Sequence, residues 1–197
     1  LILFSCISSI AKADVFAGGF IILSNGDTVL CQIKIAGKKK VTNYSTLVVL
    51  SYSGEEKIYK AKDKEVLEYG YQYLGSNFIY RFAEVSKNFE SGFFRLIDNG
   101  KKYKLYVNYL SDMNNGVTVT LPHYVIFKPN GEYKDLTTHV LGNWKKNLRI
   151  ILSDNPEALI ELETISRKEI DVFVKKLNQQ DHNFLHYHYR VFVLKKH

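Results

Sequence analysis

Apolar and polar residues alternate along most of residues 14–136 in a pattern that is typical of short antiparallel β-strands. Apolar, often β-branched runs are separated every eight to twelve residues by turns rich in glycine, asparagine and serine. The predicted strands are 20–23, 28–35, 47–52, 57–60, 66–73, 77–82, 93–97, 102–109 and 117–128, the last interrupted at Pro122. About nine strands of this kind predict an antiparallel β-sandwich or a partly open barrel.

The clearest predicted element is a hairpin over residues 20–35, F-I-I-L-S-N-G-D-T-V-L-C-Q-I-K-I. Asn25-Gly26 favours a two-residue type I′ turn, because both residues tolerate a positive φ. Such a turn pairs Phe20 with Cys31, and the side-chain period of two then decides which residues share a face. The apolar residues on the predicted core face are Phe20, Ile22, Val29, Cys31, Ile33 and Ile35.

The apolar period lengthens to that of a helix after the last predicted strand. Trp144, Leu148 and Ile151 recur at i, i+4 and i+7, which predicts an amphipathic helix. Asn155-Pro156 predicts the start of a second helix, and the capping box Ser166–Glu169 predicts a third. We therefore expect a mainly β, α+β protein with two or three C-terminal amphipathic helices packed on its sheet.

The sequence divides into four predicted segments. They are a signal peptide at 1–13, an antiparallel β domain at 14–136, a helical segment at 137–180 and a tail or edge strand at 181–197. The alternation over residues 184–194 is that of a last edge strand, and a frayed terminus is the alternative.

The first thirteen residues, L-I-L-F-S-C-I-S-S-I-A-K-A, are typical of the later part of a secretory signal peptide. Small residues at Ala11 and Ala13 place cleavage before Asp14, and the absence of a preceding basic region suggests that the sequence begins inside the signal. Two alternatives are a lipobox, with acylation of Cys6, and an ordinary first strand. We expect an exported protein that is periplasmic, outer-membrane-associated or extracellular.

The basic composition bears on three kinds of partner, which are anionic surfaces, nucleic acid and the membrane. The formal net charge is +7, from 27 Lys and Arg against 20 Asp and Glu. Lysine clusters are spread over 38–40, 101–102, 145–146, 175–176 and 195–196, rather than gathered in a nucleic-acid-binding motif. We expect weak attraction to anionic surfaces and no nucleic acid partner. The predicted strands and the run at 1–13 are too short to cross a bilayer, so we expect a protein that is not integral to the membrane.

Few residues suggest chemistry. His182, His186 and His188 form a candidate metal site, because His186 and His188 would share one face of a strand. Asp27 and Asp63 are the carboxylates considered for acid–base catalysis, but neither has an evident partner. Serine-hydrolase motifs and phosphate-binding loops are absent from the sequence, and we predict no cofactor.

Cys31 and the pair Gly18-Gly19 are expected to have structural rather than chemical roles. Cys31, the one cysteine that would remain after cleavage, is expected to be a buried, unreactive thiol. Gly18-Gly19 precedes a strand rather than a helix, so it is interpreted as a slack start to the domain.

Three stretches carry a resemblance to a family. They are G-F-I-I-L-S-N-G-D-T-V-L-C-Q-I-K-I, F-F-R-L-I-D-N-G-K-K-Y-K-L-Y-V and the late N-W-K-K-N-L with L-S-D-N-P-E. Together they resemble uncharacterised exported proteins of Bacteroidetes-type bacteria over roughly residues 18–178. Many of those proteins have Cys where this chain has Asn155 before Pro156. The resemblance implies an envelope or secreted location and a β-rich domain with a helical end, and it implies no activity.

We expect a non-catalytic exported module that binds an envelope protein or a glycan through its aromatic strands. The alternative is a small periplasmic hydrolase or metal-dependent enzyme that uses a His and carboxylate site assembled by the fold. An enzyme would place several titratable groups in one concave pocket, whereas a binding module would present an open aromatic or apolar surface.

Overall fold

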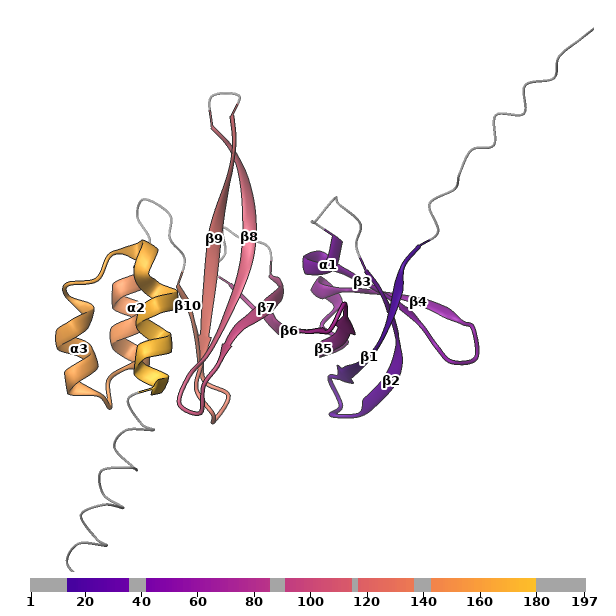
Figure 1. Ribbon diagram of the computed structural model, residues 1–197, viewed down its shortest axis with the longest axis horizontal. Coiled ribbons are helices and arrows are strands. Elements are labelled where there is room, and N and C mark those ends of the chain that lie inside the picture. The colour runs from indigo at the N-terminus through magenta and orange to yellow at the C-terminus, as the bar shows by residue number, and fades with distance from the viewer. Residues whose placement is uncertain (1–13, 36–41, 86–90, 115–116, 137–142, 180–197) are drawn as a thin grey trace, which may run out of the picture.

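The computed structural model describes residues 14–35, 42–85, 91–114, 117–136 and 143–179 (Figure 1). Its strands are β1 Phe16–Leu23, β2 Thr28–Lys34, β3 Thr46–Leu50, β4 Glu56–Lys60, β5 Val66–Tyr73, β6 Ser76–Ala83, β7 Gly92–Asn99, β8 Lys104–Asn114, β9 Val117–Phe127 and β10 Tyr133–Leu136. Its helices are α1 Thr42–Ser45, η1 Ala61–Asp63, α2 Trp144–Ile151, α3 Pro156–Leu162, η2 Arg167–Glu169 and a helix over residues 170–179.

The ten described strands form one open antiparallel sheet in the order β10-β9-β8-β7-β6-β5-β1-β2-β3-β4. Strands β5 to β10 make one meander and β1 to β4 make another. The pairing of β1 with β5 joins the two meanders. The predicted class, a mainly antiparallel β protein with C-terminal helices, is confirmed.

The register predicted for the first hairpin is wrong by one residue. Leu23 N–H donates to the Asp27 carbonyl at 2.9 Å, and Gly26, with φ +92°, donates to the Leu23 carbonyl at 2.9 Å. This longer turn needs a positive φ at Gly26 alone. It pairs Phe20 with Leu30 rather than with Cys31.

The one-residue shift moves the first strand's side chains to the opposite faces. Ile21 is buried together with Cys31 and Ile33, whereas Phe20 and Ile22 lie on the other side of the sheet. We call these sides the inner face and the outer face. The inner face carries Ile21, Cys31, Ile33, Tyr69, Tyr80 and Phe93, and the outer face carries Phe20, Leu30, Gly70 and Ile79.

The N-terminal part of the sheet curls around its own inner face. Aromatic rings fill the curl: Tyr69 and Tyr80 stack with centroids 4.6 Å apart, and Phe93 meets Tyr69 edge-on at 5.0 Å. Helix α1 contacts β7 so closely that a Cβ added to Gly92 would lie 2.7 Å from the Tyr44 carbonyl oxygen. One open sheet and the short helix α1 therefore enclose these aromatic rings.

The helices cover the inner face over the C-terminal strands. The register continues from Tyr80 through Arg95 to Val107, and Leu105 lies on the same side of β8. Figure 1 shows α2 and α3 on one side of β8 and β9. The buried residues of this layer are Leu105, Ile126, Leu136, Leu148, Ile151, Leu162, Phe173 and Val174.

The predicted helix starts are confirmed. The Asn155 side chain accepts a hydrogen bond from Ala158 N–H at 3.1 Å, with Pro156 in the first turn. Both bonds of the capping box between Ser166 and Glu169 are present. The side-chain bond from Glu169 to Ser166 also lowers the pKa of the Glu169 carboxyl. Local side-chain capping therefore sets these two boundaries.

The interruption predicted at Pro122 is wrong, because β9 runs through it. Pro122 pairs with Tyr109 of β8, whereas β10 pairs with β9 only over Tyr124–Phe127. Pro122 thus lies beyond the described pairing with β10, where a missing N–H removes no ladder bond. Strand β8, at 11 residues, is longer than the predicted strand 102–109, and β9 forms one continuous strand of 11 residues in place of two short pieces.

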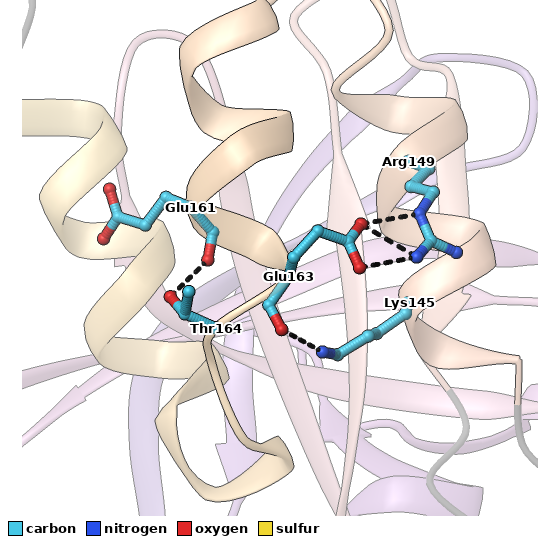
Figure 2. Close-up of polar contacts among 5 residues, drawn as sticks. All are labelled: Lys145, Arg149, Glu161, Glu163 and Thr164. Atoms are coloured by element: carbon cyan, nitrogen blue, oxygen red, sulfur yellow. Dashed lines mark hydrogen bonds and ion pairs between the residues drawn. The ribbon is translucent and has the colours of Figure 1, made fainter.

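Several polar contacts fasten the helical layer, two of which involve Glu163 and Asn178. Figure 2 shows Arg149 of α2 holding the Glu163 carboxylate through bonds of 2.8–3.0 Å, while Lys145 donates to the Glu163 carbonyl at 2.9 Å. Near the end of the 170–179 helix, Asn178 accepts from Tyr103 N–H at 3.1 Å and donates to the Tyr103 carbonyl at 2.9 Å. Asn178 thereby ties the last helix to the β7–β8 connection.

Replacement of Asn178 by alanine should lower the free energy of unfolding by about 1–3 kcal/mol, because both bonds to the Tyr103 backbone are lost in a partly buried place. Urea denaturation followed by Trp144 fluorescence measures this change. Glu163→Gln is the comparison, since Arg149 and Glu163 are 49% and 54% exposed and an exposed pair contributes about 0–1 kcal/mol. An Asn178→Ala protein as stable as the wild type would contradict the assignment.

Candidate binding groove

An open groove of about 360 Å³ crosses strands β1, β5 and β6. Its lining residues are Gly18, Gly19, Phe20, Gly70, Tyr71, Gln72, Asn77, Phe78 and Ile79. None of these nine residues carries a charged side chain. The groove therefore offers apolar contact and neutral hydrogen-bonding groups.

The groove lies where β1 separates from β5. The pairing of the two strands ends at Gly19 and Tyr71, while Ala17 and Gly18 continue to pair with β2 alone. Beyond Tyr71, β5 continues to pair with β6 only. The separation of the strands leaves a fork in the sheet, and the groove occupies it.

Two of the three glycines in the groove are required by packing. A Cβ added to Gly19 would lie 2.2 Å from the Gly70 carbonyl oxygen, and one added to Gly70 would lie 2.7 Å from the Phe20 ring. The prediction that Gly18-Gly19 is a slack start to the domain is wrong, because both residues lie inside β1. Close approach of β1 to β5 is the reason for glycine at Gly19 and Gly70.

Gly18 has no such explanation. A Cβ added there would meet no heavy atom within 4 Å, and Gly18 is not among the residues with a positive φ. Glycine inside a strand costs about 0.5–1 kcal/mol relative to alanine. Glycine at this position keeps the groove open, because a side chain at Gly18 would occupy it.

Apolar side chains and amides share the outer-face side of the groove, where Phe20 and Ile79 lie on the same side of the sheet as Gln72 and Asn77. Gln72 and Asn77 lie opposite each other on β5 and β6, whereas the rings of Tyr71 and Phe78, stacked with centroids 5.2 Å apart, lie on the inner face. Both amides are exposed, and within the described part of the chain neither side chain has a hydrogen-bond partner. Two free amides beside apolar side chains suit a ligand that has both hydroxyl groups and apolar faces.

The residues predicted to form a metal or catalytic site are not among those that line the groove. His182, His186 and His188 lie outside the described residues, as does Cys6, so the structure does not address them. Among the described ranges, no group of three or more histidines, cysteines and carboxylates is placed to hold a metal ion.

The two carboxylates considered for catalysis lie apart from the groove. Asp27 accepts a hydrogen bond from the Asn25 side chain at 2.7 Å and belongs to the turn between β1 and β2. Asp63 is exposed at the end of η1. Neither residue lines the groove.

A histidine–carboxylate pair that sequence reasoning missed joins β9 to β10. His123 Nε2 and Asp135 Oδ1 are 2.5 Å apart, and the His123 ring lies edge-on to Phe94. His123 is only 2% exposed, and neither residue lines the groove. This pair therefore stabilises the edge of the sheet rather than contacting a ligand in the groove.

Cys31 is confirmed as a buried free thiol. It lies in the inner-face core, where burial raises the pKa of its thiol. A raised pKa disfavours the reactive thiolate, so the residue packs as a small apolar side chain.

No family model, curated protein or solved structure matches this chain. The helices in the described part of the chain include none that is long and apolar enough to cross a membrane.

Gly18→Ala should raise the free energy of unfolding by about 0.5–1 kcal/mol, because the strand loses an unneeded glycine. Gly19→Ala should lower it, because its Cβ would meet the Gly70 carbonyl oxygen at 2.2 Å. Urea denaturation of both variants beside the wild type measures the two changes. A stable Gly19→Ala protein would contradict the close approach of β1 to β5.

Proposed function

We propose that this protein is a non-catalytic, exported or envelope-associated binding module that holds a neutral glycan in the groove between β1 and β5. The observation that carries the proposal is Gly18, a glycine in the lining of the groove that has no packing or conformational reason to be glycine. Glycine in a strand often marks the close approach of a ligand.

The lining matches the chemistry of a sugar ring. Phe20 and Ile79 provide apolar surface for the C–H groups of a sugar, and the amides of Gln72 and Asn77, on the same face of the sheet, provide donors and acceptors for its hydroxyl groups. A volume of about 360 Å³ is near the lower end of the usual range for ligand sites. We infer that the groove takes a short segment of the glycan.

The absence of charge in the lining argues for a neutral ligand and for binding without catalysis. General acid–base chemistry needs a titratable group with a suitable pKa within reach of the substrate. The groove offers Tyr71 but no carboxylate, histidine, lysine or cysteine. Export, which the signal-like residues 1–13 predict, would bring the protein to polysaccharides of the cell envelope.

The direct test measures binding to a panel of neutral bacterial envelope glycans, with Gly18→Leu as the blocking variant. We expect the wild type to bind a neutral glycan and Gly18→Leu to lose affinity by about tenfold or more, because the new side chain occupies the ligand's place. Thermal denaturation checks that Gly18→Leu remains folded. Unchanged affinity in the folded variant, or binding of an extended peptide in place of any neutral glycan, would overturn the proposal.

The amides provide a second prediction. Gln72→Ala and Asn77→Ala should each weaken glycan binding by about 2- to 10-fold, the usual value of one neutral hydrogen bond. Both residues are exposed, so stability should change little. Asn99→Ala, at an exposed position at the end of β7, is the matched control and should bind like the wild type. Equal loss of affinity in the control would show that the effect is not local to the groove.

A further inference from the structure

Arg95 lies on the inner face of the sheet and has no counterion among the residues that the structure describes. It lies on β7 between Tyr80 of β6 and Val107 of β8, and it is partly buried. Within the described residues, its guanidinium makes no ion pair and no hydrogen bond. A partly desolvated charge without a partner is unfavourable, so an anion beside it would be stabilised.

Arg95 is the cross-strand neighbour of Tyr80, which belongs to a group of tyrosines on the inner face. The rings of Tyr44, on α1, and Tyr80 meet edge-on at 6.0 Å, and the hydroxyls of Tyr71 and Tyr80 are 3.5 Å apart. Burial raises the pKa of the Tyr44 and Tyr80 phenols, and the positive charge of Arg95 opposes both shifts. Arg95 is therefore within electrostatic range of both rings.

Carboxylates are missing from this cluster. The groups that act electrostatically on Tyr44 and Tyr80 are Arg95 and other tyrosines, among the residues that the structure describes. Tyr109, one of these tyrosines, is 45% exposed, so solvent reaches this part of the inner face. The cluster thus contains the N–H donors of one guanidinium and the O–H donors of several tyrosines, and none of its described members is an anion that could accept from them.

We infer that Arg95, together with the hydroxyls of Tyr44 and Tyr80, binds an oxyanion, either a carboxylate or a phosphate group of a small ligand. A guanidinium donates two parallel N–H groups to either anion, and the phenols donate to its remaining oxygen atoms. The site differs from the glycan groove, because Arg95, Tyr44 and Tyr80 are not among the residues that line the groove.

The test is thermal denaturation of the full chain in sodium phosphate and in sodium acetate, with sodium chloride holding the ionic strength constant. We expect Tm to rise by about 3–5 °C for each tenfold increase of the bound anion above its Kd. A response to phosphate alone would identify a tetrahedral oxyanion, and a response to acetate a carboxylate. Arg95→Met should abolish the response.

Two further variants keep the inference falsifiable. Tyr44→Phe removes only a hydroxyl and should weaken the anion response several-fold with little change of Tm in chloride. Arg149→Met removes an arginine that pairs with Glu163 on the surface and should retain the full response. No response to either anion in the wild type, or an unchanged response in Arg95→Met, would overturn the inference.

Discussion

The antiparallel pairing of β1 with β5 joins two meanders into one sheet, and both the core and the groove depend on it. All other neighbours in the sheet are consecutive along the chain, whereas this pair closes a loop that contains β2, β3 and β4. Gly19 and Gly70 allow the approach, because a side chain at either position would collide with the partner strand. The same pairing ends at Gly19 and Tyr71, so the close contact that unites the fold also opens the fork beside it.

One face of the sheet is covered in two different ways. Over the first strands, the inner face is buried by the curl of the sheet itself, with Tyr69 and Phe93 at its centre. Over β8 to β10, the C-terminal helices cover the same face with Leu148 and Phe173. Arg95, on β7, lies between the aromatic core of the first strands and the core under the helices. A charged residue can therefore occupy the inner face without entering either apolar core.

The two proposed sites differ in the ligand chemistry that each can recognise. The groove has a neutral lining of rings, amides and backbone, and its selectivity would come from shape and from hydrogen bonds. The Arg95 cluster has a cation that pairs with no described carboxylate and lies beside phenols, and its selectivity would come from charge and from the planar guanidinium fork.

Local signals in the sequence determined most element boundaries and the fold class. Two helix starts follow from Asn155-Pro156 and from the Ser166–Glu169 capping box. Alternation of apolar and polar residues, together with turn signals, located nearly every strand. Both kinds of signal work because capping and side-chain period are short-range properties. Only the tertiary structure decided the rest. Gly18 and Gly19 are neighbours of the same type in the sequence. Packing against β5 requires glycine at Gly19, whereas Gly18 faces open space in the groove. Arg95 and the His123–Asp135 pair depend likewise on strand register and long-range packing, which no local pattern specifies.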